Sequence, residues 1–172
     1  MASLPTIEHL NGLYDAAAQA ALAPLFEGAP SFVVRLLAQR PYRSWNELLD
    51  RAASIAARLP DADLVELINS HPRIGASPQT VSVLSYNEQG YDRDDGPAQL
   101  QAELERLNTA YEQRFGFRFV IFVAGRPRSE IAPIIGQRLA ASRDEEKQRA
   151  VTDILAIARD RLSSLSATEE GP

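Results

Sequence analysis

Helix-forming residues fill this sequence almost from end to end, and turn residues interrupt them at intervals that suit short helices. Ala, Leu, Arg, Glu and Gln dominate, and these residues favour helices. Ser44-Trp45-Asn46-Glu47 and Ser142-Arg143-Asp144-Glu145 both have the spacing of a capping box, in which serine and glutamate satisfy free amides at a helix start. Pro60 and Pro72 mark helix ends. We therefore expect an all-α fold, a single compact bundle of about seven to nine helices.

Turn residues and apolar stripes set the bounds of the expected helices. They cover residues 15–27 (with Asp15 as N-cap), 31–39, 45–59, 61–70, 97–115, 129–140 and 143–165. Residues 117–123 are apolar and β-branched, and form either a short strand or an extended buried segment. The least regular part is 72–97, which includes the acidic residues Asp92, Asp94 and Asp95. A long irregular stretch inside a helical domain is more often functional than idle.

The length and composition exclude several classes of protein. With 172 residues we expect one domain over 1–172, an ordered core over about 6–165 and a frayed tail at 166–172. The net charge of −5 argues against nucleic acid as a partner. Without cysteine there is no disulfide or thiolate chemistry, and two histidines make a metal centre unexpected. The longest apolar run, about six residues, is far short of the ~20 that a membrane span needs.

Neither end of the sequence carries a recognisable targeting signal. Residues 1–5 lack the basic and apolar regions of a signal peptide, and residues 169–172 are not a peroxisomal tripeptide signal. We therefore expect a cytoplasmic protein without a membrane partner.

Arg161 lies close to the apolar stripe of the last expected helix. At 100° per residue it falls about 50° from the centre of the stripe formed by Val151, Ile154, Leu155, Ala158, Leu162 and Leu165. A guanidinium aimed at a core must meet an anion, because an unpaired buried charge is costly. Two interpretations stay open: a structural pair with an internal carboxylate or a stem that reaches solvent, and an anion-binding site in a pocket.

His71 and Glu88 are the candidates for acid–base chemistry. His71 lies where a helix stops at a His-Pro pair, and histidine is suited to proton transfer near neutral pH. It is equally a candidate for a structural role. On a helical turn, Ser85, Glu88 and Gln89 share one face. The alternative there is a solvated helix start with a capping box formed by Ser85 and Glu88.

Several motifs together resemble the OHCU decarboxylase family, which decarboxylates 2-oxo-4-hydroxy-4-carboxy-5-ureidoimidazoline (OHCU) on the route from urate to allantoin. They occur in the family order from about residue 6 to 165. The motifs are His71-Pro72-Arg73-Ile74-Gly75, Ser85-x-x-Glu88-Gln89, Leu107-Asn108-x-x-Tyr111-Glu112-x-Arg114-Phe115-Gly116-Phe117, Phe119-Val120-Ile121, Gly125-Arg126 and Ile157-Ala158-x-x-Arg161-Leu162. One His-Pro pair carries no weight alone, whereas the ordered set is specific.

The resemblance implies an all-α homodimer that needs no metal or organic cofactor and acts on a small molecule, OHCU. His71 matches the catalytic histidine and Glu88 the carboxylate beside it. Arg161 matches an arginine near the ureido or carboxylate end of the substrate. The implied substrate-binding residues are Pro72, Ser85, Gln89, Phe119, Val120, Ile121, Phe122, Val123 and Arg161. A functional association with urate oxidase and 5-hydroxyisourate hydrolase follows from the same route.

The chemistry implied by the resemblance suits these side chains. The substrate carries its carboxylate on a carbon that also bears a hydroxyl and adjoins a C=N group, so the electrons released with CO₂ enter that conjugated system. Histidine and glutamate can then move the protons, and protonation on one face gives (S)-allantoin.

The sequence departs from the family where Arg73-Ile74 replaces a common Asp-Leu and where Arg118 replaces a common proline. These departures keep open a lyase for another ureido or imidazoline acid. A separate alternative is a non-enzymatic helical interaction module.

Overall fold

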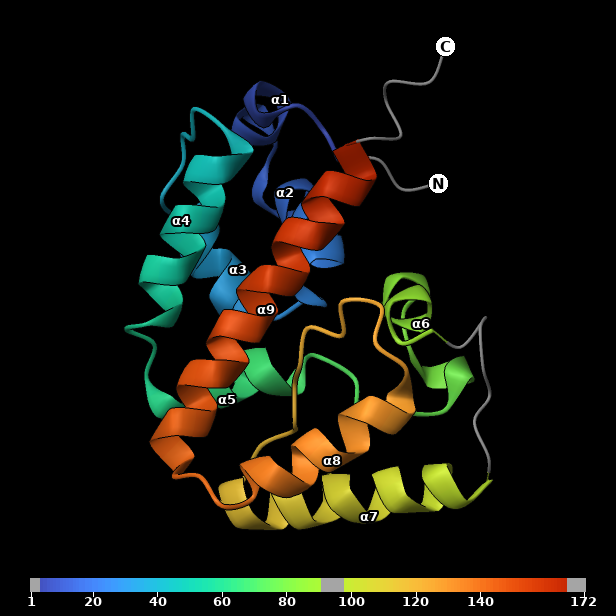
Figure 1. Ribbon diagram of the computed structural model, residues 1–172. Coiled ribbons are helices and arrows are strands. Elements are labelled where there is room, and N and C mark those ends of the chain that lie inside the picture. The colour runs from blue at the N-terminus through green and yellow to red at the C-terminus, as the bar shows by residue number, and fades with distance from the viewer. Residues whose placement is uncertain (1–3, 91–97, 167–172) are drawn as a thin grey trace. The chain divides into compact units, whose positions relative to one another are not determined.

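The computed structural model describes residues 4–90 and 98–166, and helices dominate both ranges (Figure 1). These ranges contain nine α-helices, one short 3-10 helix and no strand, which confirms the expected all-α fold and helix count. The bounds are α1 Ile7–Gly12, α2 Asp15–Phe26, α3 Pro30–Leu37, α4 Trp45–Ala56, α5 Asp61–Asn69, η1 Pro78–Thr80, α6 Val83–Glu88, α7 Ala98–Phe115, α8 Arg128–Arg138 and α9 Arg143–Ser166. No described helix combines the length and apolar composition needed to cross a lipid bilayer.

The described chain divides into two compact units. The first comprises residues 4–70 and 154–166, and the second comprises residues 71–90 and 98–153. The boundary falls between Asp153 and Ile154, inside α9, so this helix contributes to both units. The single domain expected from the sequence stays a prediction. The acidic residues Asp92, Asp94 and Asp95 and the expected tail from residue 167 lie outside the described residues.

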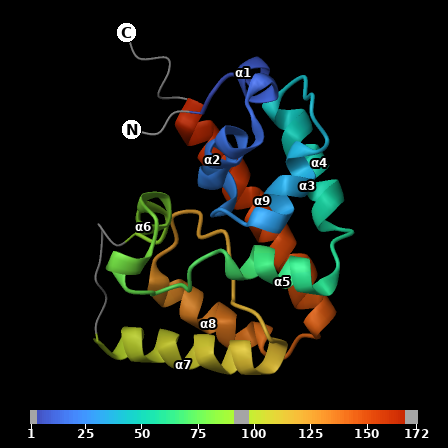
Figure 2. The same cartoon turned by 180° about the vertical axis from the view of Figure 1, so that it is seen from behind.

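The first unit is organised around α3, which contacts α2, α4 and α5. These helices lie next to one another in both views (Figures 1 and 2). The inner face of α3 carries Phe32, Val33, Leu36 and Leu37, all of which are buried. Phe32 packs edge-on against Phe26 of α2, with ring centroids 5.1 Å apart. Burial of this apolar face stabilises α3, which at eight residues is too short to be stable alone.

The second unit contains α7 and α8 side by side, as both views show (Figures 1 and 2). Its core is aromatic: Tyr111 packs against the rings of Phe115, Phe117 and Phe119 at centroid distances of 4.5, 6.0 and 5.2 Å. Two of these rings belong to the non-helical residues 117–123. The aromatic cluster therefore fixes an irregular segment against the end of α7.

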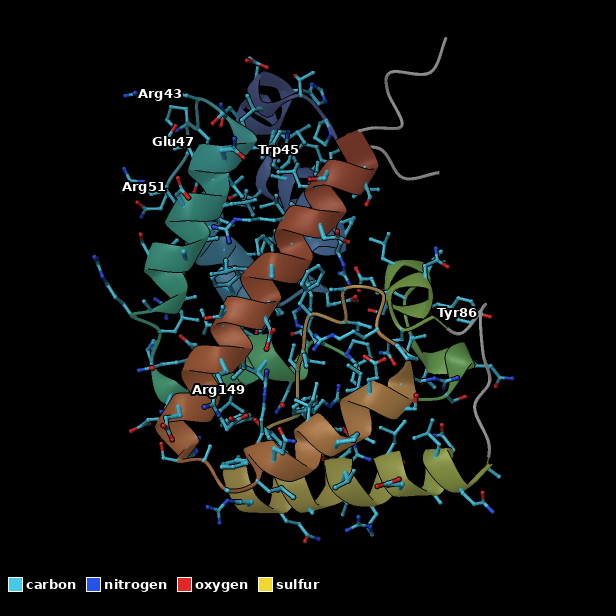
Figure 3. The ribbon with its side chains drawn as sticks, in the orientation of Figure 1. Arg43, Trp45, Glu47, Arg51, Tyr86 and Arg149 are labelled. Atoms are coloured by element: carbon cyan, nitrogen blue, oxygen red, sulfur yellow. The ribbon has the colours of Figure 1, made fainter. Side chains whose placement is uncertain are left out.

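The predicted capping box at Ser142 is complete, whereas the one at Ser44 is only partly formed, because Glu47 accepts from the N–H of Arg43 instead of that of Ser44. The Ser44 hydroxyl accepts a hydrogen bond from the Glu47 backbone N–H at 3.1 Å, and the Glu47 carboxylate accepts one from the Arg43 N–H at 2.8 Å. Figure 3 shows Arg43 and Glu47 close together where α4 begins. At the start of α9, Glu145 N–H donates to the Ser142 hydroxyl, and Ser142 N–H donates to the Glu145 carboxylate.

One expectation about local structure is wrong, one pair of alternatives is resolved in favour of an extended buried segment, and one helix had not been expected. Asp15 is not an N-cap: Tyr14 occupies that position, and the Asp15 carboxylate pairs with Arg40 at 2.6 Å. The ionic partner and the favourable helix dipole suit a carboxylate inside the first turn. Residues 117–123 form no strand. Helix α1, capped by Thr6, had no expected counterpart because its six residues are too few to show a periodic stripe.

Candidate active site

His71 is the first residue of the second unit and is almost completely buried, with 3% of its surface exposed. Helix α5 ends at Asn69 with Ser70 as C-cap, as expected from Pro72. The His71 carbonyl accepts a hydrogen bond from Arg118 Nη1 at 3.1 Å. Pro72 follows as a half-buried residue. The backbone that carries the imidazole is thus fixed by a proline on one side and by an arginine at the carbonyl.

The next three residues are held by the side-chain amide of Gln89. Its Oε1 accepts from the Gly75 N–H at 2.9 Å, and its Nε2 donates to the Arg73 carbonyl at 3.1 Å. Gln89 is 6% exposed. The amide bridges backbone groups that no helix or strand pairs, and this satisfies polar groups that would be costly to bury alone.

Two further amides from α7 bind the same loop. Asn108 Nδ2 donates to the Ile74 carbonyl at 3.0 Å, and Gln101 Nε2 donates to the Gly75 carbonyl at 2.6 Å. Gly75 has a φ of 76°, and a Cβ added there would lie 3.0 Å from Leu104 Cδ1. This position therefore requires glycine both for its backbone conformation and for the space beside α7.

Helix α6 carries three of the predicted site residues. Ser85 and Gln89 are buried and Glu88 is half-buried, and Gln89 is the C-cap of this helix. The N-cap is Ser82, whose hydroxyl accepts from the Ser85 N–H at 3.1 Å. The alternative of a capping box formed by Ser85 and Glu88 is therefore wrong. Ser82 is the N-cap, and Ser85 lies inside the helix, where its N–H donates to the Ser82 hydroxyl.

A small pocket of ≈ 90 Å³ adjoins Glu88 within the second unit. It is lined by Glu88, Gln89, Gly90, Gly125, Arg126, Pro127 and Arg128. The structure thus brings two predicted site residues together with two arginines that the sequence analysis did not single out as site residues. Arg128 is only 8% exposed. The signal available in the sequence was the Gly125-Arg126-Pro127-Arg128 run before α8, which resembles many surface turns.

Residues 119–123 are held by charged side chains rather than by amides. Arg138 Nη1 of α8 donates to the Val120 carbonyl at 3.3 Å, and the Phe122 N–H donates to Asp153 Oδ1 of α9 at 3.1 Å. Arg138 and Asp153 also pair with each other at 3.1 Å. The Arg138 guanidinium lies 5.1 Å from the ring centroid of Phe119. One ion pair therefore fixes the middle of the segment.

Arg126 holds the end of the same segment. Its Nη2 donates to the Phe122 carbonyl at 2.6 Å and its Nε to the Val123 carbonyl at 2.9 Å. Among the described residues, the backbone N–H and C=O of Ile121 have no hydrogen-bond partner, although Ile121 is only 4% exposed. Buried backbone groups are nearly always paired, so the N–H and C=O of Ile121 stand out as an available donor and acceptor in this segment.

A buried carboxylate lies beside the Arg138–Asp153 pair. Glu146 of α9 is fully buried; it accepts from the Tyr111 hydroxyl at 2.5 Å and pairs with Arg149 at 2.5 Å and with Arg138 at 3.9 Å. Burial raises the pKa of Tyr111 well above its usual range, and the hydrogen bond to Glu146 raises it further. The tyrosine therefore stays protonated and serves as a permanent donor.

Arg161 belongs to the first unit and is 2% exposed. Its Nη2 pairs with Glu27 Oε1 at 2.7 Å, and its Nη1 donates to the Pro24 carbonyl at 2.8 Å. The predicted burial of this guanidinium is confirmed, and the contacts are those of the structural alternative. Its role towards a substrate stays a prediction.

The described residues include no group of three or more His, Cys, Asp or Glu side chains that could hold a metal ion. The chemistry available in the second unit is that of an imidazole, a carboxylate, several guanidinium groups and backbone amides. These groups can bind a small polar molecule and move protons.

Comparison with known proteins identifies the family. The family model for OHCU decarboxylase matches residues 11–163. The chain belongs to the OHCU decarboxylase family. A crystal structure of OHCU decarboxylase in the presence of (S)-allantoin has the same fold, with a TM-score of 0.71 over 90% of this chain and 99% of that chain at 22% identity.

Two relatives illustrate the range of the family. The 2-oxo-4-hydroxy-4-carboxy-5-ureidoimidazoline decarboxylase of Haloferax volcanii is 26% identical over 167 residues, which cover 95% of this chain and 98% of the relative. A uric acid degradation bifunctional protein of Bacillus subtilis is 32% identical over 170 residues, which cover 96% of this chain. The chain spans only 33% of the length of that bifunctional protein.

Proposed function

We propose that this chain catalyses the cofactor-independent decarboxylation of OHCU to (S)-allantoin in urate degradation. The observation that carries the proposal is the match of the family model to residues 11–163, within which His71, Glu88 and the 119–123 segment all lie. A histidine that is only 3% exposed, beside a loop whose backbone is bound by four side chains, is the arrangement expected of a group that must keep a fixed position.

The proposed reaction needs only proton transfer from the protein. The bond between the carbon and the carboxylate breaks, its electron pair enters the adjoining C=N system, and CO₂ leaves. The nitrogen of the former C=N group gains a proton. The hydroxyl on the decarboxylated carbon then loses its proton and becomes a carbonyl, while the neighbouring carbon gains a proton on one face, so one proton is taken up for each CO₂ released. In our proposal His71 is the general acid and base, and Glu88 fixes the hydroxyl that His71 serves.

Ile121 is the proposed recognition point for the heterocycle. Its unbonded N–H and C=O match the acceptor and donor of a cyclic urea or amide, and the neighbouring backbone groups are already bound by Arg138, Asp153 and Arg126. Ser85, Gln89 and Pro72 complete the proposed binding set. We assign Arg161 to the carboxylate or ureido end of the substrate from the resemblance alone.

The test is to couple the protein to urate oxidase and 5-hydroxyisourate hydrolase and to record the optical sign of the allantoin by circular dichroism. An optical readout is needed because OHCU also decarboxylates spontaneously, which gives no excess of one enantiomer. We expect (S)-allantoin from the wild type, and loss of at least about 100-fold of the stereoselective rate in His71→Ala and in Glu88→Ala.

His9→Ala is the matched control, since it removes the other histidine, which is exposed and lies in the first unit. It should leave the rate unchanged. Near-normal turnover by folded His71→Ala or Glu88→Ala would refute the assigned roles. Racemic product from the wild type would refute the function itself and favour a related acid as substrate.

The setting of the reaction is part of the proposal. We infer a cytoplasmic homodimer that works in sequence with urate oxidase and 5-hydroxyisourate hydrolase, as the route from urate requires. The Bacillus subtilis relative, whose name describes a bifunctional protein of uric acid degradation, supports a close functional link to another step. Light scattering after size-exclusion chromatography tests the dimer, and a monomer at micromolar concentration would contradict it.

A further inference from the structure

Arg73 ties the loop that follows His71 to helix α7. Its Nε donates to Glu112 Oε1 at 2.7 Å and its Nη2 to Glu112 Oε2 at 2.5 Å, so the guanidinium and carboxylate meet through two parallel hydrogen bonds. Its Nη1 also donates to Glu105 Oε1 at 3.1 Å. Glu105 lies seven residues before Glu112, about two turns away on the same face of α7. The side chains of Arg73 and Glu112 are 30% and 26% exposed, so the pair is partly shielded from water.

This geometry differs from that of an ordinary surface ion pair. A two-bond contact fixes the plane of the guanidinium as well as its distance, which a single contact does not. The hydrogen bond to Glu112 also raises the pKa of Arg73 above its usual value. The tie therefore restrains the orientation of the backbone at residue 73, two positions after the imidazole.

Other side chains bind the carbonyl groups of the same loop. The His71 carbonyl is bound by Arg118, the Arg73 carbonyl by Gln89, and the Ile74 carbonyl by Asn108. These contacts fix the carbonyl groups, while the Arg73–Glu112 tie links the loop to α7 through a side chain. A carboxylate at residue 73 would face Glu112 with like charge. The tie therefore depends on the combination of residues in this chain.

We propose that Arg73, through its two-bond pair with Glu112, is a positioning residue for the His71 imidazole. The expected effect on turnover rests on the proposed function, whereas the expected effect on the position of the imidazole does not. The tie sets where the imidazole lies when it transfers a proton, and it contributes to turnover rather than to substrate affinity. A small displacement of a catalytic group is enough to lower a rate substantially.

A charge swap tests this proposal. Arg73→Glu and Glu112→Arg each place like charges in contact, whereas the double variant Arg73→Glu with Glu112→Arg restores an opposite pair. All three variants are made in a Glu105→Gln background, because Glu105 contacts residue 73 and would repel a glutamate there. We expect each single variant to lower kcat about tenfold with KM within about twofold, and the double variant to recover to within about threefold, as coupling between contacting residues predicts. Melting temperatures check that each variant is folded.

A second readout does not depend on activity. The chain has only two histidines, so an imidazole ¹H–¹⁵N spectrum contains two sets of signals, and His9→Ala assigns them. We expect the His71 signals to shift or broaden in both single variants and to return in the double variant, while the His9 signals stay in place. If the wild type failed to turn over OHCU, the proposed function would fall, and this spectrum would still decide whether the tie positions His71.

Arg35→Glu is the control for loss of an ordinary ion pair, because Arg35 forms a single-contact salt bridge with Asp63 in the first unit. It should change neither kcat nor the His71 signals. Unchanged His71 signals and kcat in the single variants would overturn the proposal, as would losses that the double variant fails to recover. A rise in KM alone would also overturn it, since it would mean that Arg73 contacts the substrate directly.

Discussion

Two non-helical segments of the second unit are held in place by different chemistry. The backbone of residues 73–75 is bound by three uncharged amides, those of Gln89, Asn108 and Gln101. The backbone of residues 120–123 is bound by charged groups, those of Arg138, Asp153 and Arg126. The first segment directly follows His71 and Pro72, and the second contains Ile121, so the backbone beside two groups of proposed site residues is fixed by two kinds of contact.

The difference has energetic consequences. A hydrogen bond between neutral groups contributes about 1 kcal/mol to stability, whereas one to a charged group contributes about 1.5–3 kcal/mol. Loss of a charged partner also leaves its opposite charge poorly solvated, which loss of an amide does not. We therefore expect the backbone of the 120–123 segment to be more sensitive than that of the 73–75 segment to substitution of the side chains that bind it.

The largest effect is expected from Asp153→Ala. It removes the acceptor of the Phe122 N–H and leaves Arg138 without its carboxylate at 3.1 Å. We expect the free energy of unfolding, measured by urea denaturation, to fall by about 3 kcal/mol. KM for OHCU should rise because Ile121 lies beside the released peptide. Asp153→Asn is the control: it keeps an acceptor for Phe122 and should cost less than half as much.

A smaller effect is expected from Asn108→Ala on the amide-held side. The variant loses the bonds from Nδ2 to the Ile74 and Leu104 carbonyls, which should cost about 2 kcal/mol in unfolding free energy. Asn11→Ala is the matched control, since Asn11 binds the Tyr42 backbone with both atoms of its amide in the first unit. Both should lose similar stability, but only Asn108→Ala should lower kcat. A cost in Asn108→Ala equal to that in Asp153→Ala would remove the proposed difference between the segments.

The smallest effect is expected from Tyr42→Phe. This variant measures the contribution of one hydrogen bond between uncharged groups and how that contribution changes when the hydroxyl ionises. The Tyr42 hydroxyl donates to the Leu36 carbonyl at 2.6 Å, and its loss should cost about 1 kcal/mol near neutral pH. Burial raises the pKa of Tyr42 to about 12, above the ~10 of an unfolded tyrosine. The contribution is therefore complete below pH ~10 and is lost as pH rises to about 12.

The measurement for Tyr42→Phe is the difference in urea unfolding free energy between wild type and variant at a series of pH values from 7 to 12. The difference should be constant up to about pH 10 and then shrink. A difference that stays constant to pH 12 would show that the hydroxyl does not ionise with the shift that its burial implies.

Local signals in the sequence predicted the features that depend on local chemistry. Ser44 and Ser142 begin their helices as expected, because a capping box is complete within four residues. The burial of Arg161 followed from the helical angle alone. In contrast, Ser82 and Ser85 are both good caps in the same short stretch, and only packing decided that Ser82 begins α6.

Features that depend on contacts between residues far apart in the chain could not be predicted from the sequence. Asp153 binds the backbone of a residue 31 positions earlier, and Arg73 meets Glu112 across 39 positions. Neither spacing has a periodic signature. The same limit applies to residues 117–123, whose apolar composition suits a strand, although in the structure aromatic packing and an ion pair hold them instead.

Gly75 narrows the routes by which this loop can change over generations. Any side chain there meets both an unfavourable φ and the methyl group of Leu104, so a replacement of this glycine stays strained at the backbone even if Leu104 is shortened first. Shortening Leu104 would itself open a void in a fully buried position. Near His71, substitutions at Gly75 are therefore expected to be rarer than substitutions at positions such as Arg73, where a second change on α7 can compensate for the loss of the ion pair.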